Sequence, residues 1–337
     1  NLASLPRLIE QTLLTGEHEV EVLSEASDFP TDLPSERESK WSAWLPISIG
    51  CNNFCSYCIV PYVRGREKSR PMEDIVADAE ALKADGVKEI TLLGQNVNSY
   101  GRDLYDEPRF ADLLRAVSAT GIERIRFATS HPKDLNDDVI KAFGELDNLM
   151  PALHLPVQSG SNAILKAMHR RYTREHYLET IKKLREVRPD IALSTDIIVG
   201  FPGETEEDFQ QTYDLIKEVG YTQVFTFIYS KREGTPAARM EDNTPREVIQ
   251  ERFERLVDLV QEGALEANQP EAGKIVPVLV EGVSKRDDSV LMGRSPKNQT
   301  VHAPIPEGVS IEDIQGTIVN VRIDVARAWY LRGQVVS

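Results

Sequence analysis

Short apolar runs alternate with amphipathic helical patterns over most of the chain. We expect six strands at Leu45–Ile49, Glu89–Leu93, Arg124–Ala128, Ala152–Val157, Ala192–Val199 and Gln223–Tyr229. Helical periodicity follows these runs at Met72–Ala84, Arg109–Ala119, Asn136–Leu146, Asn162–Met168 with Arg174–Val187, Glu206–Val219 and Glu247–Glu266. A repeated strand–helix unit predicts a parallel sheet covered by helices on one side. Six units are too few for an eight-fold barrel, so we predict an α/β fold with an open, partial TIM barrel.

The pattern changes after the last long helix. From there on, short strands separated by turn residues are expected at Val276–Glu281, Val290–Gly293, Thr300–Ala303, Gly316–Val325 and Tyr330–Val335. This pattern of short strands and turns predicts a small all-β barrel of the oligonucleotide-binding type. Proline and glycine between Asn268 and Gly273 mark the boundary. We therefore expect a tail and linker over residues 1–36, a core domain over 37–268 and a small barrel over 269–337.

Composition and charge exclude several classes of protein. The 337 residues are 41% hydrophobic, which is ordinary for a globular protein and argues against a disordered or fibrous chain. Neither a membrane-spanning apolar run nor a signal peptide is seen, so we expect a cytoplasmic protein. The net charge of −15 argues against a bulk nucleic-acid coat. Because the segment from Gln269 onward holds equal numbers of basic and acidic residues, that charge falls on the core and its tail.

All three cysteines lie in one loop after the first predicted strand. Cys51, Cys55 and Cys58 have the spacing C-x3-C-x2-C, which suits three thiolate ligands on one face of an iron–sulfur cluster. Because such clusters ordinarily take four cysteines, one iron would keep an open site. The alternative is a zinc knot or a plain solvent-exposed loop. A structural zinc site would need a fourth ligand nearby, and the nearest histidine, His131, is far along the chain.

The cysteine loop resembles the C-x3-C-x-aromatic-C motif of the radical S-adenosylmethionine enzymes, with Tyr57 as the aromatic residue. The resemblance implies a [4Fe–4S] cluster held by the three cysteines, which are then both metal ligands and catalytic residues. It also implies that the open iron binds S-adenosylmethionine, that Tyr57 lies near the adenine, and that the core is the six-unit barrel of that family.

Longer phrases resemble one branch of these enzymes, the methylthiotransferases. They are CIVPYVRGREKSRP (Cys58–Pro71), LLGQNVNSYG (Leu92–Gly101), HLPVQSGS (His154–Ser161), MHRRYTREHY (Met168–Tyr177) and DIIVGFPGETEEDF (Asp196–Phe209). GQNVNSYG and YSKREGTPAA (Tyr229–Ala238) favour the bacterial tRNA enzymes. The resemblance implies a methylthio group added to C2 of N6-isopentenyladenosine beside the anticodon, a tRNA anticodon stem-loop as partner, flavodoxin or ferredoxin as electron donor, and a monomer.

Three alternatives stay open. One is a methylthiotransferase that acts on an aspartate of a ribosomal protein, and another is a tRNA enzyme that acts on threonylcarbamoyladenosine. The third is a non-enzymatic RNA-binding module with a zinc loop.

Further cofactor-binding candidates follow the strands. At the end of the second strand stand Gly94, Gln95 and Asn96, where the resembling family has a Gly-Gly-Glu-like segment that holds the methionine amine; here the carboxylate is missing. Gln158 and Ser159 follow the fourth strand, and Asp196 interrupts the apolar fifth strand. The alternative for each is structural: a polar turn, an ordinary loop or a satisfied aspartate.

Two basic runs interrupt the acidic core, and they are candidate RNA contacts. The first comprises Arg64, Arg66, Lys68 and Arg70, and the second Lys166, Arg170, Arg171 and Arg174. If both lie at the mouth of the barrel, they can meet RNA phosphates; otherwise they are solvated surface charge. The C-terminal barrel resembles the tRNA-binding TRAM domain, and its candidates are Lys285, Arg286 and Arg294, with Lys297, Arg322 and Arg332 nearby. Its alternative role is to cap the larger barrel.

The N-terminal segment departs from the resembling family. Methylthiotransferases carry a preceding domain with three more cysteines and a second [4Fe–4S] cluster, whereas here no cysteine precedes Cys51. Asn1 to about Ser24 resembles the tail of that domain. We therefore expect that this chain does not ligate the second cluster, and that it cleaves S-adenosylmethionine without inserting sulfur.

Overall fold

The structure is a computed structural model that describes residues 4–21, 37 and 39–336. Most of the predicted linker, and the first three residues of the predicted tail, lie outside the described residues. The tail that is described forms one helix, α1 (Leu5–Thr15), in which no side chain is buried. Among the described residues no helix is long and apolar enough to cross a lipid bilayer.

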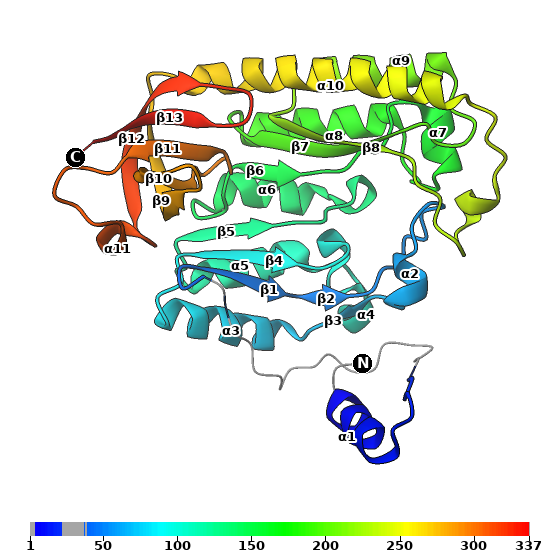
Figure 1. Cartoon of the computed structure of the whole chain (residues 1–337), viewed down its shortest axis with the longest axis horizontal. Helices are drawn as coiled ribbons and strands as arrows, with labels where there is room; N and C mark the ends of the chain where they lie inside the picture. Colours follow the sequence, from blue (N-terminus) through cyan, green and yellow to red (C-terminus); the bar gives the residue numbers. More distant parts are fainter. Residues whose placement is uncertain (1–3, 22–36, 38, 337) are drawn as a thin grey trace.

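The core contains six parallel strands in chain order, as predicted. One sheet has the order β1 (Ser42–Pro46), β4 (Glu89–Leu93), β5 (Arg124–Phe127), and the other β6 (Ala152–His154), β7 (Ala192–Val199), β8 (Gln223–Ile228). A parallel bridge between Ile125 and Leu149 joins them. In the described part of the chain β1 and β8 remain as free edges, so the barrel is open between them (Figure 1). The prediction of an open six-unit barrel is confirmed.

Helices cover the outside of this curved sheet (Figure 1). The long ones are α3 (Met72–Ala84), α5 (Phe110–Ala119), α6 (Asp137–Glu145), α8 (Arg174–Val187), α9 (Glu206–Val219) and α10 (Arg246–Asn268). Strand β7 shows why the layers form, because Leu193, Ile197 and Val199 are buried in the core while Ser194 and Asp196, on the opposite face, are half-buried. The strands therefore present apolar side chains to the helices and polar ones to the interior of the barrel.

Short elements surround the carboxyl ends of the strands. They are β2 (Ser48–Ile49), α2 (Val60–Val63), β3 (Lys68–Ser69), η2 (Val97–Ser99), α4 (Arg102–Tyr105), η3 (Pro132–Asp134), α7 (Asn162–Ala167) and η4 (Pro236–Arg239). β2 is the second half of the first predicted strand, Leu45–Ile49, and α7 was predicted as a helix. The others were not predicted, because two to four residues are too few to show a periodicity.

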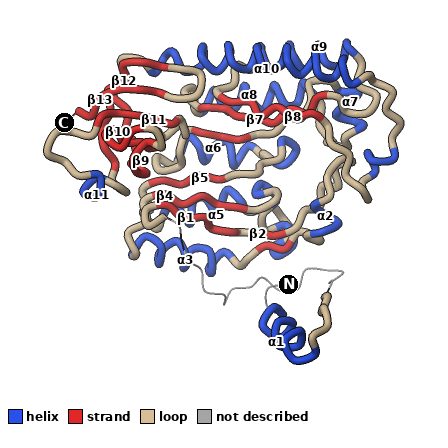
Figure 2. The backbone as a smooth tube through the Cα atoms, in the orientation of Figure 1, coloured by secondary structure: helices blue, strands red, loops and turns tan. Residues whose placement is uncertain are grey.

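The C-terminal segment forms a closed five-stranded barrel, which confirms the predicted second fold. Its strands are β9 (Ile275–Ser284), β10 (Asp287–Arg294), β11 (Thr300–Pro304), β12 (Ile318–Ala326) and β13 (Leu331–Val336), in the spatial order β10-β11-β13-β12-β9. Val278, Val280 and Leu291 belong to its own apolar core. The turn η5 (Gln269–Glu271) leads into it, and a short helix, α11 (Ile311–Ile314), precedes β12. Figure 2 shows the strands of this small barrel packed at one end of the molecule.

The small barrel docks onto the end of the core where the parallel strands begin, away from α2 and α7 (Figure 1). Two buried arginines of β5 make this contact. Arg124 donates hydrogen bonds to the carbonyls of Arg294 and Pro277 at 3.0 and 2.8 Å. Arg126 donates to those of Pro296 and Ser295 at 2.9 and 2.8 Å. The side chain of Asn268 adds bonds of 2.9 and 3.0 Å to the carbonyls of Arg327 and Ala328.

Candidate cofactor site at the carboxyl ends of the strands

The three cysteines lie on the loop between β2 and α2, at the carboxyl end of the first strand. This loop is held from both sides. The backbone N–H of Cys51 donates to the carbonyl of Gly65 at 3.1 Å, and that of Cys58 closes a turn onto Cys55 at 3.0 Å. Ser56 donates to the loop after α7, from its N–H to Met168 at 3.0 Å and from its hydroxyl to Ala167 at 2.8 Å. The loop is therefore positioned before any metal binds.

The residues present fit an iron–sulfur cluster. All three thiols are free, Cys51 and Cys55 are buried, and Cys58 is half-buried. Among the described residues no group of three or more Cys, His, Asp or Glu side chains converges as a site for one metal ion. A cluster suits this spacing better than a single zinc ion, since each thiolate can bind a different iron. Burial raises the pKa of the Cys51 thiol to about 11 and also raises that of Cys58, so cluster binding displaces protons.

A buried cation lies beside the cysteines. The Arg170 guanidinium, on a residue only 5% exposed, lies 3.5 Å from the sulfur of Cys55. Its other donors reach the carbonyl of Pro156 at 2.7 Å and the hydroxyl of Tyr172 at 2.9 Å. A fixed positive charge here offsets the negative charge that thiolates and a reduced cluster bring into a desolvated site. Tyr57 packs against the small apolar cluster that contains Ile164 and Met168.

The candidates after the second strand border the cysteine loop. The side-chain oxygen of Gln95 accepts a hydrogen bond from the N–H of Gly50, the residue before Cys51. A Cβ on Gly94 would lie 2.5 Å from the hydroxyl oxygen of Ser48, so a larger residue here would displace that side chain. Asn96 is buried and donates to Asp134 at 2.7 Å, and its own side-chain oxygen has no hydrogen-bond partner among the described residues. Asn96 therefore retains an acceptor for a ligand.

The remaining cofactor candidates occupy different environments. Gln158 has a φ of 74° and pairs through its backbone with β7, which fixes the loop beside the cysteines. Ser159 is fully buried, and its hydroxyl contacts those of Thr212 and the N–H of Ser161, both at 3.2 Å. These bonds hold the Ser159 hydroxyl within the protein, and its contact with a cofactor stays a prediction. Asp196 lies inside the barrel, with its carboxylate 3.5 Å from Nε2 of His154.

Glu67 is a site residue that the sequence reasoning missed. It is 7% exposed, and one carboxylate oxygen accepts the Ser99 hydroxyl at 2.7 Å. The other oxygen is buried without a hydrogen-bond partner among the described residues. Burial raises the pKa of this carboxyl from 4.5 to about 7, with Asp103 and Asp134 adding repulsion. Glu67 stands within a basic run, and nothing in its sequence context distinguishes it from an exposed residue.

Both basic segments contain residues that contact the cysteine loop, since Gly65 accepts the N–H of Cys51 and Arg170 lies beside Cys55. Arg64, Arg66 and Arg171 are exposed, and the Arg66 guanidinium lies 4.4 Å from the centre of the Phe54 ring. Lys68 is half-buried on β3. Arg70 is buried and donates to the carbonyl of Pro46 and to Asp78, at 3.1 and 2.7 Å.

Arg70 and Arg170 are buried, and their guanidinium groups are bonded within the protein. Contact of these arginines with RNA stays a prediction.

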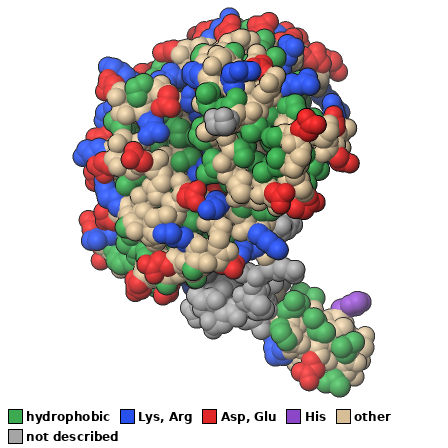
Figure 3. Space-filling view, turned by 90° about the vertical axis from the view of Figure 1, so that its left-hand side faces the viewer, with side chains coloured by type: hydrophobic (Ala, Val, Ile, Leu, Met, Phe, Trp, Pro, Cys, Tyr) green, Lys and Arg blue, Asp and Glu red, His purple; other side chains and the backbone are tan. Residues whose placement is uncertain are grey.

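The C-terminal candidates lie at the far end of the core from the cysteines (Figure 1). Lys285 and Arg286 are exposed on the turn between β9 and β10, whereas Arg294 is half-buried with its guanidinium 3.6 Å from Glu281. On this face of the molecule, Lys and Arg side chains are interspersed with Asp and Glu (Figure 3). An RNA that touched both basic regions would therefore have to extend along the side of the barrel.

Two family models match the chain. The radical SAM superfamily matches residues 45–216, and the TRAM domain matches residues 269–336. The chain thus belongs to the radical SAM superfamily, whose members bind an iron–sulfur cluster and S-adenosylmethionine, and carries a C-terminal TRAM domain.

Curated relatives define the family within that class. Proteins named tRNA-2-methylthio-N(6)-dimethylallyladenosine synthase from Thermoanaerobacter sp. (strain X514) and Alkaliphilus oremlandii (strain OhILAs) are 50% and 51% identical over the whole chain, which covers 71% of each. The relative from Streptomyces viridosporus is 50% identical over 98% of the chain, which covers 66% of that protein. The chain belongs to this family of methylthiotransferases.

Proposed function

We propose that this chain contains the radical-generating core and the TRAM domain of a tRNA methylthiotransferase. The reaction adds a methylthio group to C2 of N6-isopentenyladenosine, the dimethylallyl form of the base, beside the anticodon. The observation that carries this proposal is about 50% identity along the entire chain to enzymes with that name. The buried three-cysteine loop with its adjacent cation supports it, because it is equipped to hold a cluster with one open iron.

The chain's own residues prepare the site for the cofactors. When bound, a reduced [4Fe–4S] cluster supplies the electron that cleaves S-adenosylmethionine to a radical able to remove hydrogen from the substrate carbon. Cys51, Cys55 and Cys58 would hold the cluster, and Arg170 would stabilise its negative charge. Gln95 fixes the backbone just before Cys51. The free oxygens of Asn96 and Glu67 would accept hydrogen bonds from the methionine ammonium group.

The proposed reaction also needs a second cluster, an electron donor and a tRNA substrate. A second [4Fe–4S] cluster would be ligated by a domain other than those described, since the chain's three cysteines all belong to one loop. Flavodoxin or ferredoxin would supply electrons, and the enzyme would act as a cytoplasmic monomer. The substrate adenosine would leave its stack in the anticodon loop in order to reach the cysteine end of the barrel.

Nucleoside mass spectrometry of tRNA tests this function. A strain without the gene should accumulate N6-isopentenyladenosine and lack its methylthio derivative, and the full-length gene should restore the product. Accumulation of unmodified threonylcarbamoyladenosine, or loss of a methylthio group from a ribosomal protein instead, would contradict the proposal.

Anaerobic reconstitution of the chain with iron and sulfide supplies the second test. The chain should bind a [4Fe–4S] cluster and release 5′-deoxyadenosine from S-adenosylmethionine, without methylthio transfer. A colourless preparation that holds only zinc would favour the non-enzymatic module.

A further inference from the structure

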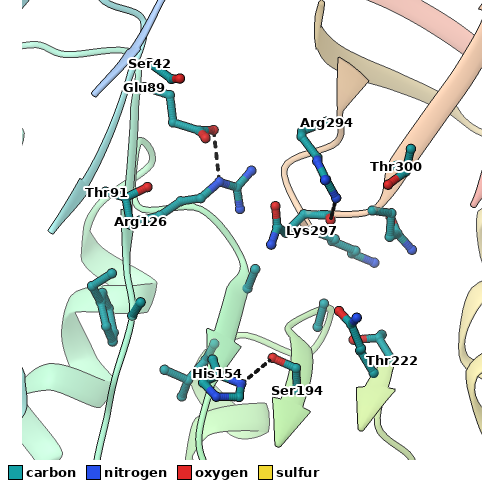
Figure 4. Close-up of a pocket in the computed structure, with 18 of the residues that line it drawn as sticks. Ser42, Glu89, Thr91, Arg126, His154, Ser194, Thr222, Arg294, Lys297 and Thr300 are labelled. Atoms are coloured by element: carbon teal, nitrogen blue, oxygen red, sulfur yellow. Dashed lines mark hydrogen bonds and ion pairs between the residues drawn. The ribbon is translucent and has the colours of Figure 1, made fainter. Parts of the chain in front are cut away.

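A cavity of about 510 Å³ lies inside the core barrel at the end opposite the cysteines. Its walls come from both domains: the first halves of the parallel strands on one side, and β9 to β11 of the TRAM barrel on the other. In Figure 4, Arg294, Lys297 and Thr300 of the small barrel face Glu89 and Arg126 on one wall and His154 and Ser194 on another. Its volume is in the range of small-molecule sites.

Three aromatic side chains that line this cavity remain exposed. Trp44 on the free edge strand β1 is 70% exposed, and Phe225 on the opposite free edge strand β8 is 41% exposed. Trp329, on the turn between β12 and β13, is 52% exposed. Large aromatic rings are usually buried, and here rings from both edges of the open barrel and from the TRAM domain line one space. Such rings offer flat faces for stacking a planar ligand.

The charged side chains that line the cavity are paired with neighbouring charges. Glu89 bonds Arg126 at 2.9 Å, Glu281 lies 3.6 Å from Arg294, and Lys297 bonds Glu271 at 2.8 Å. A site with balanced charge favours neither a metal ion nor a bare phosphate. Hydroxyl and amide groups such as those of Thr91, Ser194, Asn298 and Thr300 complete the lining, and they suit the edges of a base or a ribose.

We infer that this cavity between the two barrels binds a nucleotide, with the base stacked among Trp44, Phe225 and Trp329 and the phosphate outside. The site is distinct from the cysteine end, where the modified adenosine would react. The inference rests on the proposed function in one respect: the nucleotide would belong to the bound RNA, splayed from its single-stranded part. A free mononucleotide has the same chemistry, and the experiment separates the two sources.

The test compares two pairs of aromatic variants of the whole chain. Trp329→Ala and Phe225→Ala remove rings that line the cavity. Tyr330→Ala and Phe227→Ala are the matched controls, because these rings are neighbours with similar exposure, 40% and 50%, yet do not line it. Binding is measured with a labelled anticodon stem-loop RNA by fluorescence anisotropy and with adenosine 5′-monophosphate by calorimetry. Thermal melting checks that each variant is folded.

Loss of one stacking contact should weaken binding about tenfold for the two cavity variants, and about twofold or less for the controls. If only the RNA responds in this way, the nucleotide belongs to the RNA; if adenosine 5′-monophosphate responds as well, the site accepts free nucleotides. Equal affinities of all four variants for both ligands would overturn the inference.

Crosslinking to the unaltered chain tests the inference even if the variants fail to fold. RNA that carries 8-azidoadenosine at its unpaired positions should crosslink to the peptides that contain Trp44 or Trp329. Crosslinks confined to the cysteine end would overturn the inference and leave the proposed tRNA modification standing. Conversely, a missing methylthio product in the tRNA assay, together with cavity crosslinks, would overturn the proposed function alone.

Discussion

At the scale of single residues, the cysteine loop is surrounded by groups whose roles depend on burial. Arg170 illustrates this, because the basic residues next to it in the sequence predict an RNA-binding surface. In the structure it is enclosed beside Cys55 and bonds Tyr172 and the carbonyl of Pro156. The exposed Arg171 next to it has the same charge and a different environment.

The first prediction concerns the charge of Arg170. Replacing it by methionine, Arg170→Met, keeps an apolar stem and removes a cation 3.5 Å from a cysteine sulfur. Because a positive charge stabilises the more negative, reduced cluster, the reduction potential of the cluster should become more negative. A redox titration monitored by electron paramagnetic resonance measures this shift. Arg171→Met is the matched control, and equal potentials in both variants at full iron content would show that Arg170 acts through packing alone.

Glu67 supports a second prediction at this scale. Glu67→Gln keeps the shape and the bond to Ser99 and removes the carboxylate charge. If the free oxygen receives the ammonium group of S-adenosylmethionine, a charge-assisted bond is lost and the dissociation constant should rise about tenfold. Equilibrium dialysis against the iron-loaded chain measures it. The exposed Glu80→Gln on α3 is the control, and unchanged affinity for Glu67→Gln would remove Glu67 from the binding site.

At the scale of elements, the sequence was sufficient to predict the parallel strands and the long helices, because apolar runs mark the strands and helical periodicity marks the helices; the strand bounds were less accurate, since the first strand covers Ser42–Pro46 and not Leu45–Ile49. The cysteine motif was sufficient to locate the cluster loop. Contacts between distant elements were not predictable in this way. Arg170 and Cys55 are 115 positions apart in the sequence. In β5, Arg124 and Arg126 alternate with Ile125, and this pattern is typical of a strand with one exposed face. Only the docked TRAM barrel explains why both arginines are buried.

The loop between β7 and α9 provides a prediction at this scale. Glu204 is 4% exposed, accepts the N–H of Gly200 at 2.8 Å and lies 3.6 Å from Arg252 of α10. Burial raises the pKa of its carboxyl from 4.5 to about 7. Between these pH values the folded state binds the proton and the unfolded chain does not. The contribution of the protonated Glu204 carboxyl to the free energy of unfolding is thus fully present below pH 4.5, and it is lost as the pH rises to about 7.

The Glu204→Gln variant should therefore become more stable, relative to the unaltered chain, as the pH rises. The difference in the free energy of unfolding between the two proteins should shift toward the variant by about 1–3 kcal/mol from pH 5 to pH 8. Urea unfolding at both pH values measures this difference. Glu207→Gln, an exposed residue in the first turn of α9, is the control. A difference independent of pH would contradict the assignment of a buried, protonated carboxyl.

At the scale of the whole molecule, the cluster loop and the TRAM domain lie at opposite ends of one open barrel (Figure 1). Fixed docking of the two barrels would set the distance between an RNA bound by the TRAM domain and the cysteine end. Arg124 and Arg126 provide this docking, since together they bond four backbone carbonyls of the TRAM barrel while Glu89 compensates their charge. Backbone acceptors make this contact independent of the TRAM side chains.

The double change Arg124→Ala with Arg126→Ala should release the TRAM barrel from the core. Breaking a buried ion pair costs about 3–5 kcal/mol, and Glu89 would be left without its partners. Each barrel has an apolar core of its own, so both should stay folded and thermal unfolding should separate into two transitions. Limited proteolysis should cut near Gln269–Gly273, which stays protected in the unaltered chain.

Release of the TRAM barrel should weaken RNA binding without affecting the cleavage of S-adenosylmethionine. The released enzyme should still cleave S-adenosylmethionine, because the cysteine loop is far from β5's contact with the TRAM barrel, and its affinity for the anticodon stem-loop should fall. Arg115→Ala is the control, since Arg115 is a surface arginine that bonds Glu145 on the neighbouring helix at 2.9 Å. If the double variant binds RNA as well as this control does, and melts in one transition, then the arginines do not hold the barrels together.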